Sequence, residues 1–354
     1  MRKSKQCARC GAQTALVVAI GLAISPAVAQ QGSAGFYEGR QIAIVVASTP
    51  GGGYDTYARL VARHMPRHLP GEPRMIVSNM SGAGGNMAAS YIVNGVPQDG
   101  SSMALVLPPT ITGGLYETVQ KLHYDPARLQ HIGSANSEVD MCFLRADTGV
   151  KSVTDLYTRE IIVGGSAEGS VSRTQPVILN NLLGTRFRVV SGYPGTRQII
   201  MAIESGEVLG VCGISYAGMA LQKPDWISSG YIKPLVQNNV KGAKSVNDLG
   251  VPRSPDLAKS EEDRQVLELI FAQQEFGRPF VTGPAVPQDR INLLRKAFMA
   301  AMADKALLAE AAALKIDIDP VSGEELQLLA ARLYSMPSRL IEKAKDAQVA
   351  RDAK

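Results

Sequence analysis

The sequence predicts an α/β protein built on parallel sheets. Strands and helices alternate along most of the chain, and glycine-rich loops stand where a strand gives way to a helix. The last third changes to alanine- and leucine-rich amphipathic helices. With 354 residues, of which 45% are hydrophobic, the chain is long enough for two domains of ordinary size. We therefore expect two α/β units with a helical C-terminal third.

The clearest unit runs from residue 42 to residue 63. The apolar run 42–47 is typical of a strand buried on both faces of a parallel sheet. The three glycines 51–53 leave backbone N–H groups uncovered at the start of a helix, where the helix dipole also favours an anion. Asp55 is expected to cap this helix or to orient a polar ligand. The alternative is a tight turn that needs glycine only for positive φ.

Similar units follow along the chain. Strands are expected at 75–78, 102–107, 141–144, 161–164, 187–191, 208–212 and 232–237, and helices at 86–93, 153–157, 175–183, 196–204, 289–302, 305–314 and 323–333, with one more after Pro337. Glycine- and hydroxyl-rich loops at 81–85 and 164–172 stand between a strand and a helix. Such loops gather at the carboxyl ends of the strands, where open α/β sheets bind their ligands.

Residues 1–29 have the pattern of an export signal. A basic start is followed by the apolar run 15–24 and by the small residues 27–29, so cleavage is expected between Ala29 and Gln30. The signal carries four positive charges and no negative ones. Its removal therefore lowers the formal net charge from +5 to +1. The basic pI is therefore no argument for nucleic acid as a partner, and the mature protein is expected in the periplasm.

Several patterns that suggest catalysis are incomplete. Residues 82–87 resemble a dinucleotide-binding turn, but Met87 stands where a third small residue belongs. His64 and His68 are four residues apart, yet they lack the glutamate of a zinc protease and are expected to be solvated. A secreted α/β enzyme remains an alternative, but no nucleophile pairs with a base. The sequence predicts a binding protein, not an enzyme, with no cofactor and no metal.

Two motifs carry a family resemblance. Pro50-Gly51-Gly52-Gly53-Tyr54-Asp55 and the segment 78–86 (SNMSGAGGN) resemble the signature pair of the Bug-type, TctC-like receptors. These receptors are the extracytoplasmic solute-binding components of tripartite tricarboxylate transporters. Segments 98–100, 191–196, 204–208 and 283–287 are similar to further elements of the family, so the resemblance covers nearly the whole mature chain. The stretch 226–280 departs from the best-known members.

The resemblance implies a type II periplasmic-binding fold. Lobe 1 would comprise residues 30–140 and 279–354, and lobe 2 residues 141–278. Two crossovers, near 139–141 and 277–281, would act as a hinge. The cleft between the lobes would hold a small carboxylate, which a monomeric receptor would deliver to the membrane permease subunits. The alternative is a periplasmic sensor that binds the same solute and docks on a signalling receptor.

The resemblance also implies which residues bind the ligand, mainly those in the first loop of each lobe. The expected set is Pro50, Gly51, Gly52, Gly53, Asp55, Thr56, Asn79, Gly84, Gly85, Ser166, Ser170, Ser172, Tyr193 and Gly195. The loops 51–56 and 166–172 are expected to face each other across the cleft. Glu168 is unusual beside a carboxylate site; if it points inward, a zwitterionic or neutral ligand is favoured over a dicarboxylate.

The resemblance finally implies a disulfide. Cys7 and Cys10 fall in the export signal, which leaves Cys142 and Cys212 in the mature chain. In a type II fold their two strands are antiparallel neighbours, and an oxidising compartment would keep the bond. The alternative is a pair of buried thiols that act as small apolar side chains.

Overall fold

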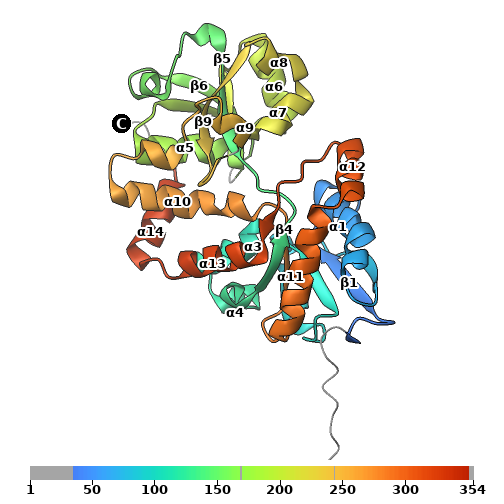
Figure 1. Ribbon diagram of the computed structural model, residues 1–354. Helices are drawn as coiled ribbons and strands as arrows, with labels where there is room; N and C mark the ends of the chain where they lie inside the picture. Colours follow the sequence, from blue (N-terminus) through green and yellow to red (C-terminus); the bar gives the residue numbers. More distant parts are fainter. Residues whose placement is uncertain (1–34, 168–169, 243, 351–354) are drawn as a thin grey trace, which may run out of the picture.

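Two β-sheets form the framework of the protein. The computed structural model describes residues 35–167, 170–242 and 244–350 (Figure 1). The first sheet has six strands in the order β11-β4-β10-β3-β1-β2, and the second has five in the order β7-β6-β8-β5-β9. The expected export signal and its cleavage site lie outside the described residues.

The strands agree with the expected ones to within a few residues. In the first sheet they are β1 (Gln41–Val46), β2 (Arg74–Asn79), β3 (Ser102–Leu105), β4 (Gln130–Ser134), β10 (Pro279–Thr282) and β11 (Val321–Ser322). In the second they are β5 (Asp140–Arg145), β6 (Ile161–Gly165), β7 (Phe187–Ser191), β8 (Gly210–Ser215) and β9 (Ile232–Asn238). The short strands β4, β10 and β11 were not expected from the sequence.

The α-helices cover both sheets. They are α1 (Gly53–His64), α2 (Asn86–Asn94), α3 (Pro108–Thr112), α4 (Val119–Leu122), α5 (Val171–Leu183), α6 (Thr196–Ser205), α7 (Tyr216–Gln222), α8 (Pro224–Ser228), α9 (Lys244–Asn247), α10 (Glu261–Phe276), α11 (Gln288–Met302), α12 (Lys305–Leu314), α13 (Gly323–Tyr334) and α14 (Ser338–Ala347). The 3₁₀-helices are η2 (Met65–His68), η3 (Ala83–Gly85), η4 (Gly113–Leu115), η5 (Pro126–Arg128), η6 (Ala146–Thr148), η7 (Val153–Tyr157) and η8 (Ser254–Leu257). None of the described helices combines the length and the apolar character needed to span a membrane.

Strand β1 is buried on both faces, as the sequence predicts. Ile44 and Val46 pack with α1 and α11, whereas Val45 packs with α2 on the opposite face. An uninterrupted apolar strand therefore indicates a sheet covered by helices on both sides.

The parallel strands of both sheets have their carboxyl ends near the segment that links the two sheets. β1, β2 and β3 are parallel, and β4 runs in the same direction because β10 lies antiparallel between β3 and β4. β6, β7 and β8 are also parallel, and β5 is antiparallel to β8 and β9. Both sheets are thus mixed. Residues 135–139 join the end of β4 to the start of β5, so the loops after the parallel strands of both sheets lie around this crossover.

The second crossover lies against the first. It consists of Gly277 and Arg278, between α10 and β10. The Arg278 N–H donates to Ser134 Oγ over 2.9 Å. Gly277 has φ of +51°, and a Cβ there would lie 1.9 Å from the Asn136 carbonyl oxygen. Only glycine allows the two crossovers to approach so closely.

The lobe boundaries 30–140, 141–278 and 279–354 stay a prediction. The C-terminal helix α14, placed in lobe 1 by that division, packs on α10 and α5 (Figure 1). Asn181 of α5 donates to the carbonyl oxygens of Ala347 and Val349, over 2.9 and 3.0 Å. Helix α14 and Val349 are therefore attached to α5, which packs on the second sheet.

Helix α10 was missed by sequence reasoning for a physical reason. Its buried residues include Val266, Leu267, Leu269, Ile270 and Phe271, which point in several directions around the helix axis. They do so because α10 contacts α14, α13, α3 and α5. A helix packed from several sides lacks the one-sided apolar stripe by which sequence patterns reveal a helix.

Candidate ligand-binding site

The first glycine loop leaves the start of α1 open. Helix α1 begins at Gly53 after the N-cap residue Gly52, and no side chain caps it. Gly51 has φ of +79°, which explains the need for glycine there. Pro50, Gly51 and Gly53 are exposed. The first N–H groups of a helix have no acceptor within the helix, so this loop can donate hydrogen bonds to an anion.

Asp55 holds the loop but does not cap the helix. It is the third residue of α1, and its carboxylate accepts hydrogen bonds from the Gly51 N–H (2.8 Å), Arg59 Nε (2.9 Å) and Asn79 Nδ2 (3.0 Å). The expectation of an N-cap is therefore wrong, because the cap position belongs to Gly52. The hydrogen bond from Arg59 is the main reason why the pKa of Asp55 falls to about 2, against the opposite effect of burial.

The remaining residues of the first loop support the same geometry. Asn79, at the end of β2, also donates to the Ser48 carbonyl oxygen over 3.0 Å. The Thr56 hydroxyl donates to the Gly52 carbonyl oxygen over 3.1 Å. Asp55, Thr56 and Asn79 thus have partners within the protein, and the exposed backbone amides are the groups left for a ligand.

Gly84 and Gly85 shape the turn before α2, and Gly85 also allows close packing. They have φ of +62° and +93°, and a Cβ on Gly85 would come within 2.9 Å of the Thr110 methyl carbon. The turn before α2 therefore needs glycine to pack closely against α3. No hydrogen bond among the described residues links these two glycines to the first loop.

Serine hydroxyl groups hold the loop of the second sheet. Ser172 Oγ accepts a hydrogen bond from the Ser166 N–H over 3.1 Å and lies 3.1 and 3.4 Å from the hydroxyl oxygens of Ser166 and Ser170. The Tyr193 N–H donates to the Gly165 carbonyl oxygen over 3.4 Å. The structure thus brings the three serines close to Tyr193. Glu168 lies outside the described residues.

Tyr193 and Gly195 belong to the neighbouring loop after β7. The Tyr193 hydroxyl donates to Glu207 over 2.6 Å, so it is turned to a partner within the protein. Gly195 is the N-cap residue of α6 and, like Ser170 before α5, provides no side-chain cap.

The helices that follow β1, β6 and β7 share an uncapped start. α1, α5 and α6, which follow β1, β6 and β7, begin without a side-chain cap. In the C-terminal part, α10, α12 and α13 are capped by Ser260, Asp304 and Ser322, whereas α11 and α14 have no side-chain cap. α7, after β8, is also capped, by Ser215. The first backbone N–H groups of the three uncapped helices α1, α5 and α6 have no acceptor within the helix, which is the arrangement that can bind an anion.

A buried polar network behind the second loop was missed by sequence reasoning. Asp140 Oδ2 accepts hydrogen bonds from Gln175 Nε2 (2.8 Å) and Gln274 Nε2 (2.9 Å). Asn238 Nδ2 in turn donates to Gln175 Oε1 over 2.7 Å. Burial, together with the charge of Glu138, raises the pKa of Asp140 to about 7. No short motif joins four residues so distant in sequence.

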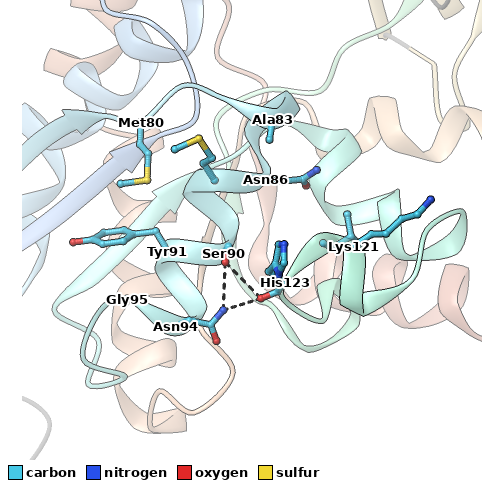
Figure 2. A pocket seen from close by; sticks show the side chains of 11 residues that line it. Met80, Ala83, Asn86, Ser90, Tyr91, Asn94, Gly95, Lys121 and His123 are labelled. Atoms are coloured by element: carbon cyan, nitrogen blue, oxygen red, sulfur yellow. Dashed lines mark hydrogen bonds between the residues drawn. The ribbon is translucent and has the colours of Figure 1, made fainter.

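Two cavities of similar size among the described residues differ in their relation to the two loops. A cavity of about 640 Å³ lies beside α2, where Met80, Met87, Tyr91 and His123 contribute to its wall (Figure 2). Another, of about 680 Å³, lies between α5 and α10, and its wall includes Val171, which stands between Ser170 and Ser172 in the second loop. Cavity size alone therefore does not select the expected site.

Definite partners are found for His64, His68, Cys142 and Cys212. His64 is buried, with Nε2 2.6 Å from Glu310 Oε2, and His68 Nε2 lies 3.0 Å from Asp304 Oδ2. The expectation that both are solvated is wrong for His64, because α12 covers this end of α1. Among the described residues, no cluster of His, Cys, Asp or Glu could hold a metal ion. Cys142 and Cys212 face each other on β5 and β8 and form a disulfide.

Comparison with known proteins gives one curated relative. A UPF0065 protein in the TAR-I ttuE-ttuC' intergenic region of Agrobacterium vitis is 29% identical over 201 residues. The match covers 54% of this chain and 56% of that protein, so the chain spans about half the length of this relative. No protein-family model matches the sequence.

Three solved structures share the fold. A TctC solute binding protein from Polaromonas has a TM-score of 0.67 at 19% identity, over 87% of this chain and 99% of that one. The periplasmic binding protein BugD gives 0.54 at 19%, over 89% and 99%. MatC from Rhodopseudomonas palustris, with bound malate, gives 0.51 at 20%, over 88% and 99%.

These comparisons confirm the predicted fold class and the resemblance to TctC and Bug proteins. The chain has the two-sheet α/β fold of periplasmic solute-binding proteins. Two of these neighbours are named as binding proteins, in line with the prediction of a binding protein from the sequence.

Proposed function

We propose that this protein is an exported receptor that binds a small organic carboxylate between its two sheets. The observation that carries the proposal is the position of the uncapped helices α1, α5 and α6. They begin at the carboxyl edges of the two sheets, and both edges lie around one crossover. Oriented amides and serine hydroxyls can hold a carboxylate without a dedicated cation.

The proposed contacts fall into two groups. The backbone amides of 52–54 hold one end of the ligand, and Ser166, Ser170 and Ser172 hold the other. Asp55, Thr56 and Asn79 position the first loop through the hydrogen bonds described above. Gly84 and Gly85 shape the turn before α2. The malate bound to the structural neighbour MatC supports a small carboxylate as the ligand class.

The proposed cellular role follows from the same neighbours. The protein acts in the periplasm as a monomer, after removal of residues 1–29, and delivers its solute to the membrane permease subunits of a tripartite transporter. The TctC and Bug neighbours support this role.

Native mass spectrometry of the gently purified mature protein tests the ligand class. We expect a co-purified small acid that is released on denaturation, and a rise in melting temperature when malate or a related carboxylate is added. A protein that carries no acid, and that no mono-, di- or tricarboxylate stabilises, would contradict the proposal. Turnover of an added acid would instead indicate an enzyme.

A further inference from the structure

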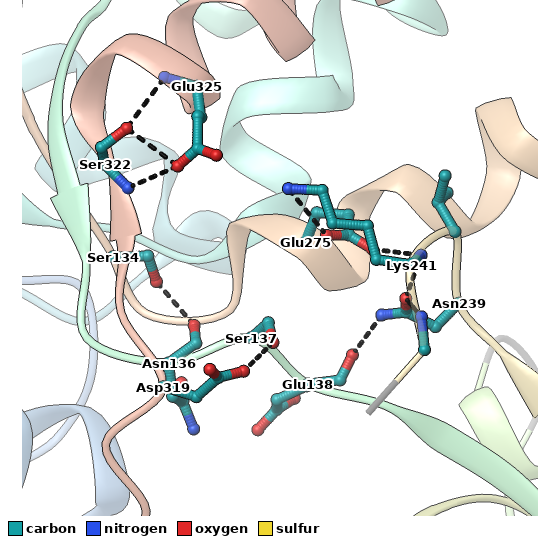
Figure 3. Close-up of polar contacts among 12 residues, drawn as sticks. Ser134, Asn136, Ser137, Glu138, Asn239, Lys241, Glu275, Asp319, Ser322 and Glu325 are labelled. Carbon is teal, nitrogen blue, oxygen red and sulfur yellow. Dashed lines mark hydrogen bonds and ion pairs between the residues drawn. The ribbon is translucent and has the colours of Figure 1, made fainter. Parts of the chain in front are cut away.

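The two crossovers form a single hydrogen-bonded unit. The backbone of Glu138, in the first crossover, donates from its N–H to the Gln274 carbonyl oxygen (3.0 Å) and accepts from Asn239 Nδ2 (2.8 Å). Figure 3 shows the contact with Asn239 at the end of β9, and the neighbouring bond from Ser137 Oγ to Asp319 (2.7 Å). The first crossover is therefore tied both to the second sheet and to the segment before β11.

Arg278 connects this unit to the first glycine loop. Its Nη2 lies 2.5 Å from Glu138 Oε1, and its side chain is only 15% exposed. The guanidinium carbon lies 4.3 Å from the centroid of the Tyr54 ring, and the Tyr54 hydroxyl donates to the Gly277 carbonyl oxygen over 3.3 Å. Tyr54 stands between Gly53 and Asp55, in the first turn of α1. One cation thus contacts both crossovers and the helix start that carries the loop.

The largely buried Arg278 cation is stabilised by these contacts with Glu138 and Tyr54. Its Nε is buried without a hydrogen-bond partner among the described residues. A second ring of α1, that of Tyr57, lies 5.6 Å from the guanidinium carbon. A largely buried cation is stabilised by a carboxylate and by aromatic faces, and it becomes costly when either is removed. Contacts with Glu138 and with α1 are therefore expected to be energetically coupled.

We propose that Arg278 is a positioning residue that fixes the first glycine loop to both crossovers, and so sets ligand affinity without touching the ligand. The binding part of this inference rests on the function proposed above. The Arg278 side chain holds the first turn of α1 at a fixed place relative to the point where the sheets are joined. When Arg278 is changed, the amides of 52–54 lose that fixed place.

Amide hydrogen exchange of segment 50–57 in the full mature protein tests the link without any ligand. Arg278→Lys keeps the charge but loses the planar group that stacks on Tyr54, and Glu138→Gln keeps an acceptor but loses the charge. Neither residue lies in the segment measured. We expect each variant to speed exchange of the hydrogen-bonded Gly51 and Thr56 amides in this segment about tenfold. The double variant should add little more, because both changes break one coupled contact.

Glu160→Gln is the matched control, because it removes an exposed ion pair with Arg188 (2.9 Å) between β6 and β7. Exchange in 50–57 should not respond to it. Exchange that stays at the wild-type rate in folded Arg278→Lys would overturn the inference, as would an equal rise in the control. If Arg278→Lys does not fold, Glu138→Gln decides the question, since the Glu138 side chain is more exposed.

A second readout separates this inference from the proposed function. Malate, or the acid identified by mass spectrometry, is titrated into wild type and Arg278→Lys. We expect the affinity of the variant to be about tenfold lower, with its exchange faster in 50–57. Wild-type affinity despite a loosened loop would refute the positioning role alone. A wild type that binds no carboxylate would refute the proposed function, while the exchange result still stands or falls by itself.

Discussion

Two buried aspartates, one behind each loop, have opposite surroundings. Asp55, next to the first sheet, accepts hydrogen bonds from a cation, a backbone N–H and an amide. Asp140, at the start of β5 in the second sheet, accepts from two neutral amides and lies near Glu138. The pKa is lowered to about 2 in the first case and raised to about 7 in the second.

The difference between the surroundings of Asp55 and Asp140 indicates how each loop is held in place. A charged anchor fixes the first loop through Gly51, so that its amides are arranged before a ligand arrives. In the described part of the second loop, serine hydroxyls bond to one another and can turn toward a ligand, and backbone contacts link the loop to residues 192–193. We therefore expect the first loop to determine affinity for the anionic group and the second to adapt to the rest of the ligand.

The largest effect is expected from the disulfide, which joins β5 and β8 in the second sheet, the sheet that also contains Asp140. Replacing Cys142 and Cys212 together by alanine opens a loop of 70 residues. The chain-entropy model gives a loss of about 4 kcal/mol in the free energy of unfolding. Urea unfolding measures it, and reductant should lower the wild-type midpoint to the same degree. An unchanged midpoint, or two free thiols in the denatured, unreduced protein, would exclude the bond.

Asp55→Asn removes the charged anchor of the first loop. We expect a loss of about 1 to 2 kcal/mol in unfolding free energy at pH 7, because a partly buried charge-assisted contact with Arg59 is lost. Since the folded-state pKa is depressed, the contribution of Asp55 is complete above its ordinary value of 3.8 and disappears as the pH falls through about 2. Variant and wild type should therefore converge in acid. A constant difference between pH 7 and pH 2 would show that the charge is unimportant; Glu160→Gln serves as the exposed control.

Asp140→Asn should show the opposite pH dependence. The raised pKa means that the folded protein holds this proton more tightly than the unfolded chain, so the contribution is present below 3.8 and is lost as the pH rises through about 7. An asparagine oxygen can still accept from Gln175 and Gln274. We expect the variant to be relatively more stable at pH 8 than at pH 5, by on the order of 1 kcal/mol. Equal differences at both pH values would refute the neutral state of Asp140.

The smallest effect is expected for Ser172→Ala in the second loop. The hydroxyl accepts one neutral hydrogen bond, from the Ser166 N–H, so the loss in unfolding free energy should be about 1 kcal/mol or less. Its effect on binding should be larger for one carboxylate than for another, because this loop is proposed to contact the variable part of the ligand. Calorimetric titration with a series of carboxylates measures this. A uniform loss across the series would mean that Ser172 holds the shared anionic group.

Much of the fold could be predicted from local patterns. The apolar run before Gly51 marks β1, and Ser322 with Glu325 forms the expected capping box at the start of α13. The disulfide pairing came from the resemblance, because spacing alone does not select a partner. Helix α10 escaped detection since it is packed from several sides.

The supporting contacts of the site could not be predicted. Arg278 meets Glu138 and Tyr54 from positions 140 and 224 residues away in the sequence. The Asp140 network is equally long-range. Asp55 was placed in the right loop but given the wrong role, because the helix begins two residues before it, at Gly53. Local sequence patterns identify the loops, but contacts between residues distant in sequence determine which side chains are available to a ligand.

The most direct test of the proposed site is a crystal structure of the mature protein with its co-purified acid. We predict a carboxylate group within hydrogen-bond distance of the backbone amides of 52–54, with Ser166, Ser170 or Ser172 at the other end of the ligand. An acid found in the cavity beside Met87 and Tyr91, beyond the reach of both loops, would contradict the assignment.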